Sequence, residues 1–180
     1  MLGALSGITE YLIEGKKMPV CANQSMTGGD YALEWFPGCG DTKPDSGDYM
    51  PIGGFTSKEQ TVEWDTIDAT SDLTVGNLKD NAASYLNYSL SGDLVARSTD
   101  EVGKVNQIAL VKHVITGAAT GGKPYAWIRL TGPDLTYEAF MIITNISLSA
   151  PTTDVVTRSF EASIAYSPFG LIVTDTPVVP

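Results

Sequence analysis

Two long alternating segments near the C-terminus, residues 137–149 and 155–166, constrain the fold more than any other part of the chain. A short connection that contains Pro151 joins them. Side chains alternate between the two faces of a strand, so each segment divides into two sets. The apolar sets are Phe140, Ile142, Ile146 and Leu148, and Val156, Phe160, Ala162, Ile164 and Tyr166; the polar sets are Asn145, Ser147 and Ser149, and Thr157, Ser159, Glu161 and Ser163. The pattern predicts a β-hairpin in an antiparallel sheet with one face open to water.

Length and composition indicate one globular domain: 180 residues, of which 43% are apolar. No segment approaches the roughly 20 apolar residues of a membrane span, and the first residues lack the basic region and cleavage site of a secretory signal. We therefore expect a protein that is made and retained in a cytoplasm, without a membrane partner. The net charge of −10 argues against tight binding of nucleic-acid phosphates, which requires clustered Lys and Arg.

In the first third of the chain, residues 1–17 are predicted to form an N-terminal arm that contains a short strand. Residues 18–50 are predicted to form a long loop or loose hairpin. The second segment is rich in Gly, Pro, Ser and Asp but contains Trp35 and Phe36. Long loops inside compact domains are commonly functional, and large aromatic side chains need a surface to cover. We expect residues 18–50 to contact another subunit. Cys21 and Cys39 lie in this segment, either as free thiols or as a disulfide.

Residues 51–166 predict the main β domain. Alternating segments at 55–67, 85–96 and 125–131 indicate strands. The only convincing helix is expected at about 100–115, ending at Gly117, with Val105, Ile108, Val111 and Ile115 on its apolar side and His113 opposite. The tail, 167–180, is expected to be an extended arm or a last edge strand.

The polar faces of the four long strands share one character. They combine five carboxylates with hydroxyls and amides and contain no Lys or Arg, although the chain has eleven basic residues. The candidate positions are Glu59, Glu63, Asp65, Asn87, Ser89, Ser91, Asp93, Asn145, Ser147, Ser159, Glu161 and Ser163; Thr61 belongs to the same predicted face but is not a candidate. A solvated sheet face usually mixes both signs of charge. Two interpretations follow: a merely hydrophilic face, or the wall of a channel through which a polyanion moves without sticking.

Motifs of catalysis and metal binding are not found in the sequence. No nucleophile elbow, HExxH or P-loop occurs, and Cys21, Cys39 and His113 do not have a zinc-site spacing. We expect no catalytic residues, no metal and no cofactor. The other non-catalytic class is a β-sandwich binding module, such as a capsid decoration protein or an adhesin. A sugar-binding module should present a row of aromatic residues, yet Trp64 and Trp127 alternate onto apolar faces.

Three stretches resemble the major tail protein, or tail tube protein, of long-tailed bacteriophages. They are Glu14–Lys17; Ile52–Thr56 with Val62–Thr70 and Tyr88–Leu94; and the hairpin from Phe140 through the Pro151 and Asp154 corner to Glu161. Residues 18–50 are longer than this resemblance leads us to expect.

The resemblance implies a mainly β fold, a β-sandwich or curled sheet with one flanking α-helix, in which each copy lends four strands to an oligomeric β-barrel. It also implies a structural virion protein that polymerises as stacked, hexameric rings, assembles in the bacterial cytoplasm and lets viral DNA pass without tight binding. The tape measure, tail terminator and distal tail proteins are the implied partners. The candidate positions would then line the lumen, and Trp35 and Phe36 would contact the next ring.

Overall fold

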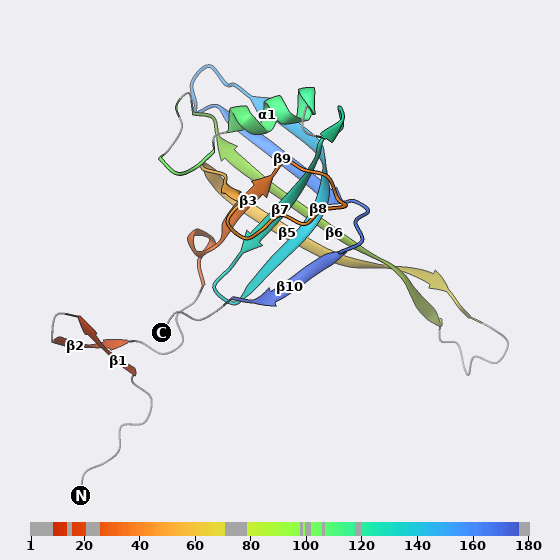
Figure 1. Cartoon of the computed structure of the whole chain (residues 1–180), viewed down its shortest axis with the longest axis horizontal. Coiled ribbons are helices and arrows are strands. Elements are labelled where there is room, and N and C mark those ends of the chain that lie inside the picture. The colour runs from red at the N-terminus through yellow and green to blue at the C-terminus, as the bar shows by residue number, and fades with distance from the viewer. Residues whose placement is uncertain are drawn as a thin grey trace, which may run out of the picture.

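The computed structural model describes residues 9–13, 16–20, 26–70, 79–97, 99, 102–105, 107–117 and 120–176 (Figure 1). Two short strands, β1 (Thr9–Ile13) and β2 (Lys16–Val20), pair as an antiparallel hairpin. The main sheet contains β3 (Ala32–Phe36), β4 (Met50–Pro51), β5 (Phe55–Asp68), β6 (Asn81–Val95), β7 (Tyr125–Thr131), β8 (Leu135–Ser149), β9 (Thr157–Ile164) and β10 (Leu171–Asp175). A 3-10 turn, η1 (Gly28–Asp30), precedes β3, and α1 (Gln107–Thr116) follows β6.

The main sheet is antiparallel and curled, with the strand order β4-β3-β7-β8-β9-β6-β5. Strand β8 connects its two halves. Residues 136–139 of β8 lie between β7 and β10, and residues 141–149 pair with β9. The fold is therefore mainly β, one curled sheet with a flanking helix, as the sequence predicted. No helix among the described residues is long and apolar enough to cross a membrane.

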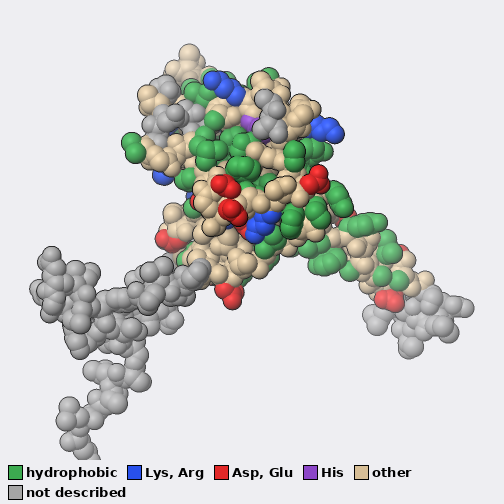
Figure 2. All heavy atoms as spheres, in the orientation of Figure 1, with side chains coloured by type: hydrophobic (Ala, Val, Ile, Leu, Met, Phe, Trp, Pro, Cys, Tyr) green, Lys and Arg blue, Asp and Glu red, His purple; other side chains and the backbone are tan. Residues whose placement is uncertain are grey.

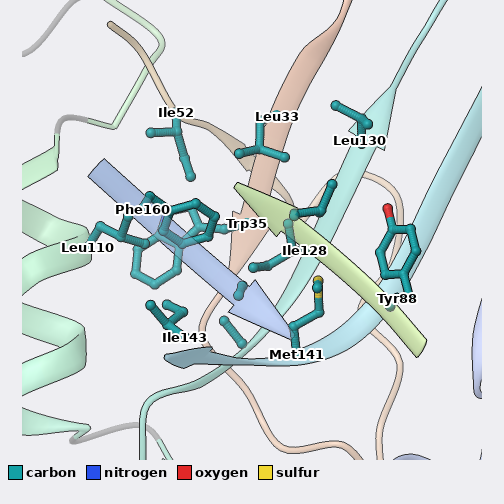
Figure 3. Close-up of a cluster of buried hydrophobic side chains, with 14 of the residues drawn as sticks. Leu33, Trp35, Ile52, Tyr88, Leu110, Ile128, Leu130, Met141, Ile143 and Phe160 are labelled. Carbon is teal, nitrogen blue, oxygen red and sulfur yellow. The ribbon is translucent and has the colours of Figure 1, made fainter. Parts of the chain in front are cut away.

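The hydrophobic core lies on one side of the curled sheet. Leu33 and Trp35 from β3, Tyr88 from β6 and Phe160 from β9 meet there (Figure 3). Leu110 from α1 packs against the same cluster. Burial of one large apolar side chain contributes roughly 1.5–3 kcal/mol. The sheet curls because the core-facing sides of both halves are apolar and bury each other.

The hairpin prediction requires a correction at Thr144. The pairing of β8 with β9 shifts by one residue between Ile143 and Asn145, so a β-bulge reverses the alternation there. Ile146 faces the core opposite Phe160, but Phe140 points to the other side of the sheet, where it joins Tyr49 and Trp127 in a second cluster. Strict alternation along residues 137–149 predicts Phe140 and Ile146 on the same face, and this prediction is wrong.

Residues 37–49 cover this second cluster on the outer side of β3, β7 and β8. Trp127 Nε1 donates a hydrogen bond of 3.1 Å to the carbonyl of Cys39. A Cβ at position 40 would lie 2.7 Å from the ring of Phe140, so only glycine permits this close approach. Cys39 is a free, exposed thiol, whereas Cys21 lies outside the described residues.

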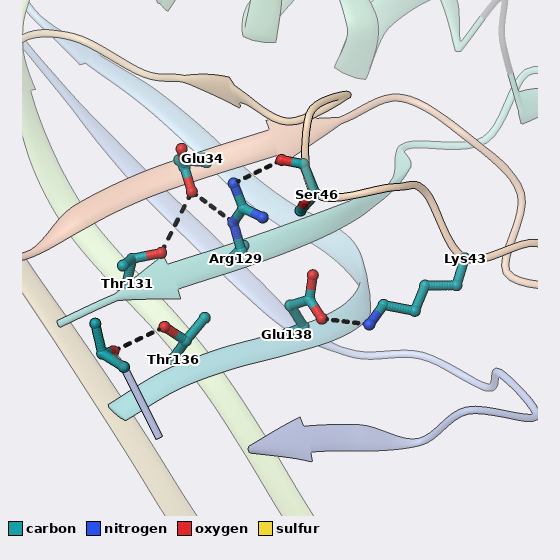
Figure 4. Close-up of polar contacts among 8 residues, drawn as sticks. Glu34, Lys43, Ser46, Arg129, Thr131, Thr136 and Glu138 are labelled. Atoms are coloured by element: carbon teal, nitrogen blue, oxygen red, sulfur yellow. Dashed lines mark hydrogen bonds and ion pairs between the residues drawn. The ribbon is translucent and has the colours of Figure 1, made fainter. Parts of the chain in front are cut away.

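Ionic contacts tie the same loop to the sheet (Figure 4). Arg129 Nε is 2.5 Å from the Glu34 carboxylate, and its Nη2 donates to the carbonyl of Ser46 at 3.2 Å. Lys43 Nζ is 2.6 Å from Glu138. We call residues 37–49 and the outer faces of β3, β7 and the first half of β8 the covered region. The segment 18–50 was predicted as a loop or loose hairpin; the structure places β3 within it, in the main sheet.

The predicted helix is present, but it begins later than predicted and a different side of it is buried. Residues 102–104 form a turn and α1 begins at Gln107. Leu110, Gln107 and His113 are buried, whereas Ile108 and Ile115 are exposed. The two polar side chains are satisfied there: Gln107 Nε2 donates to the carbonyl of Arg97, and His113 Nε2 lies 2.7 Å from that of Tyr125. The predicted apolar side was therefore wrong, although the end at Gly117 (φ +52°) was right.

The C-terminal tail was predicted to be either an extended arm or an edge strand. It contains a strand, β10, which pairs antiparallel with β8 from Leu135 to Ala139. At the other side of the sheet, β5 and β6 continue past the body as a two-stranded arm (Figure 1). We define the arm as residues 62–68 of β5 with residues 81–87 of β6. The connection 71–78 lies outside the described residues.

Candidate functional site

The predicted polar residues come together on one face of β5, β6, β9 and the second half of β8. Residues that oppose each other in an antiparallel ladder point to the same side of a sheet. The cross-strand partners form four rows: Ser57–Asp93–Ser159–Ser147, Glu59–Ser91–Glu161–Asn145, Thr61–Ser89–Ser163 and Glu63–Asn87. We call these four rows the polar face. It lies on the side of the sheet opposite the core.

Asp93 holds three strands together at one end of the polar face. Ser57 Oγ donates to its Oδ2 at 3.1 Å, and Ser159 Oγ donates to its Oδ1 at 2.8 Å. The backbone N–H of Asp93 donates in turn to Ser57 Oγ at 3.0 Å. Both carboxylate oxygens therefore have hydroxyl donors from neighbouring strands, which fixes the orientation of this side chain.

Glu59 and Glu161 lie in the next row, on the two strands that flank β6. Ser91 stands between them in the register, so their backbones are separated by two strand spacings, about 10 Å. A shallow hollow of about 230 Å³ opens at this place, lined by both glutamates together with Ser57, Ser91, Asp93 and Ser159. Both carboxylates are exposed.

The cations of the same strands lie on the opposite side of the sheet. Lys58 pairs in register with Gly92, and Arg158 pairs with Leu94, so both belong to the core-facing side. Lys58 Nζ donates to the carbonyl of Gly28 at 3.1 Å. Burial, with a smaller contribution from Lys104, lowers the pKa of Lys58. Charge is thus segregated across this part of the sheet, with anions on one side and cations on the other.

Eleven of the twelve predicted positions belong to the four rows; the exception is Asp65. Asp65 follows Glu63 on β5 at a register shift between Trp64 and Thr66, and it is exposed. The structure adds Ser57, which the sequence analysis omitted. Its position, two residues before Glu59, continues the alternation and would have revealed it.

Trp35 does not lie at the surface, where a contact with the next ring of subunits would require it. Its side chain is only 3% exposed, in the core of its own subunit, and its ring meets that of His113 edge to face at a centroid distance of 5.1 Å. The prediction for Trp35 is therefore corrected: β3 alternates, and its odd positions face the core. Phe36 is half-buried and packs against the second cluster; its contact with a further ring stays a prediction.

The four-stranded surface ends in two unpaired edges. The strand order places β5 last, so no described strand pairs with its outer edge. Strand β8 pairs with β7 only as far as Ile142, so residues 145–149 have one edge without a strand partner among the described residues. Unpaired strand edges present backbone N–H and C=O groups to any further strand. The polar face is thus bounded on both sides by groups that can pair.

The described residues place no histidine on the polar face. The single histidine, His113, is bonded to a backbone carbonyl on the other side of the sheet. Among the described residues, no three His, Cys, Asp or Glu side chains group as metal ligands.

The fold resembles that of chains in tail assemblies. A chain of the virion of a native gene transfer agent particle superposes with a TM-score of 0.61 at 14% identity, covering 84% of this chain and 99% of that one. A chain in the tail of an empty gene transfer agent particle, determined with C6 symmetry, gives 0.61 at 16% identity over the same shares. The SPP1 tail tube gives 0.56 at 11% identity, covering 87% of this chain and 83% of that one. No protein-family model and no curated protein sequence matches the chain. At these identities the likeness concerns the fold, and the chain has the fold of tail tube proteins.

Proposed function

We propose that this protein is a structural subunit of a phage-type tail tube, built of stacked rings whose lumen is lined by the polar face. One observation supports this above all: a cation-free, acidic and hydroxyl-rich face is bounded by two unpaired strand edges, in a chain with the fold of tail subunits. Unpaired strand edges do not stabilise an isolated subunit, and they promote its association with other strands. A closed ring removes them.

The directions of the strands suit a ring. Strands β8, β9, β6 and β5 alternate in direction, so β5 runs antiparallel to β8. Rotation about a ring axis keeps strand directions, and β5 of one copy would therefore pair antiparallel with β8 of the next. Each copy contributes two different edges, which makes the contact heterologous and allows the rotation to close.

The charges favour this pairing over a two-fold dimer. Two β5 edges brought together would oppose Glu59, Glu63 and Asp65 to a second acidic strand, and like charges directly opposite destabilise a sheet. Residues 144–149 of β8 carry no charge. The acidic edge of β5 can pair with them without repulsion.

A ring of six copies agrees with the symmetry of the gene transfer agent tail. Four strands from each of six copies would give a barrel of about 24 strands, which is wide enough to leave an aqueous channel. Each copy would turn Glu59, Glu63, Asp65, Asp93 and Glu161 toward that channel. Duplex DNA repels such a wall and finds no Lys or Arg to bind, while salt limits the repulsion to about 8 Å. The DNA would pass through without being held.

Stacking of such rings would give a tube in the virion, assembled in the cytoplasm of the host. Contacts that repeat head to tail along an axis do not close and so build a filament. The two ends of the tube would then contact other tail proteins, with the tape measure, terminator and distal tail proteins as the expected classes. No role as an enzyme is proposed.

Electron microscopy of the purified protein at increasing concentration tests the assembly. Rings or tubes with a central channel are the expected result. Persistent monomers at every concentration, also after addition of tube fragments as seeds, would contradict a tube subunit and favour a binding module.

A charge reversal tests the lumen. Particles that carry Glu63→Lys with Glu161→Lys should assemble tails but release DNA more slowly, because lysines on the wall bind phosphates. The matched control, Asp154→Lys with Asp175→Lys, makes the same change of charge at two exposed residues outside the polar face. Normal DNA release by the first variant would show that this face does not line the passage.

A further inference from the structure

The apolar side of the β5–β6 arm has no partner among the described residues of the subunit. In register, the core-facing row of Val62 and Tyr88 is followed by the row of Trp64 and Leu86. Tyr88 is 1% exposed, but Val62 is 51% and Trp64 56% exposed. Figure 2 shows hydrophobic side chains along the arm beyond the body of the sheet. The core-facing side of the sheet thus continues onto the arm, where no other part of the described chain covers it.

A second apolar side chain is exposed at the opposite edge of the same four-stranded surface. Leu148 on β8 pairs in register with Arg158, and Arg158 with the buried Leu94, so Leu148 belongs to the core-facing side. It is 54% exposed. Both unpaired edges therefore carry exposed apolar residues, and both sets lie on the same side of the sheet.

We propose that the apolar side of the arm, with Val62 and Trp64, packs on a second copy of this chain along the β8 edge that carries Leu148. This inference rests on the proposed ring. It identifies the side chains that would be buried where two copies of the chain meet in the ring. Pairing of β5 with β8 of the next copy would bring Trp64 and Leu148 to the same, outer side of the joint. The polar face would stay on the inner side.

We expect a second copy of this chain to cover the apolar side of the arm, because the two edges complement each other. The β5 edge is acidic on one side and apolar on the other; residues 145–149 are uncharged on one side and carry Leu148 on the other. Joining the two edges covers the apolar residues without placing like charges opposite each other. Two β5 edges paired with each other would instead place two acidic strands side by side.

The tryptophans provide a direct test. Of the three in the chain, Trp35 and Trp127 are buried, and only Trp64 is exposed. Acrylamide should quench one component of the fluorescence of the monomer, and this component should disappear on assembly. Trp64→Phe should lack it in both states. Wild-type rings in which Trp64 is quenched as strongly as in the monomer would overturn the inference and leave the proposed function intact.

Assembly thresholds give the second test. Trp64→Ser and Leu148→Ser should each raise the protein concentration needed for ring formation at least about tenfold, as the loss of a large buried interface residue does. Circular dichroism of the monomers should stay unchanged, because both side chains are exposed there. The control Ile115→Ser removes an apolar residue that is 77% exposed on α1. An unchanged threshold for both variants, or an equal increase for the control, would overturn the inference. Wild-type protein that never assembles would instead overturn the proposed function, and the inference with it.

Discussion

The polar face and the covered region lie on the same side of one curled sheet, yet their charges are organised in opposite ways. In the covered region the two carboxylates that stand on the sheet each have a cation: Glu34 contacts Arg129, and Glu138 contacts Lys43. The polar face has four carboxylates, Glu59, Glu63, Asp93 and Glu161, and no Lys or Arg. Charges that are buried within a chain must be paired there, whereas a single sign can persist only where water or another molecule meets the surface. The contrast therefore separates a surface that the subunit covers itself from one that it leaves open.

The largest expected effect comes from a residue directly behind the polar face. Phe160 lies between Ser159 and Glu161 in β9 and is fully buried. Phe160→Asp should destabilise the fold by more than about 4 kcal/mol, because it removes a large core side chain and buries an unpaired charge. Loss of the cooperative transition in urea unfolding would check this. The adjacent Glu161→Gln serves as the control, and equal stability of the two variants would show that the alternation of β9 is misassigned.

The ionic contacts of the covered region should matter for stability. The side chains of Arg129 and Glu34 are 14% and 16% exposed, and Arg129 also lies over the ring of Tyr49 at 4.2 Å. Arg129→Met should cost about 3 kcal/mol, because it leaves the carboxylate of Glu34 without its cation. The midpoint of urea unfolding measures the loss.

A double variant separates the charge from the packing. Arg129→Met combined with Glu34→Leu should recover much of the stability, since no buried charge is then unpaired. A cost below about 1 kcal/mol for Arg129→Met alone would mean that the covered region is as open to water as the polar face.

Asp93 is the one polar-face carboxylate with hydrogen bonds from both neighbouring strands. Asp93→Asn keeps the shape but removes the charge and replaces one acceptor oxygen by a donor, so one of the two serine hydroxyls loses its acceptor. We expect a loss of about 1 kcal/mol in the free energy of unfolding. An increase in stability would show that repulsion among the carboxylates outweighs these hydrogen bonds.

The sequence predicts the polar face better than the covered region, and the reason is physical. Period-two alternation depends on neighbouring residues only, and it placed Glu59, Ser91 and Glu161 on one face. The β-bulge at Thr144 leaves no local signal in a run of Ile and Thr, so Phe140 was put on the wrong side. The burial of Trp35 and His113 likewise depends on partners far away in the sequence, the carbonyl of Tyr125 among them.

The smallest expected effect concerns the exposed carboxylates, and it provides the sharpest contrast with Arg129. Glu59→Gln with Glu161→Gln should change the free energy of unfolding by less than about 0.5 kcal/mol, because both side chains are exposed and neither has a partner cation to lose. Any change should be a gain, and it should shrink between low salt and 0.5 M NaCl, since salt screens the repulsion that the substitutions relieve. Urea unfolding at the two salt concentrations measures both. A loss of stability comparable with that of Arg129→Met would mean that these carboxylates are paired within the subunit. The charges of the polar face would then be organised like those of the covered region.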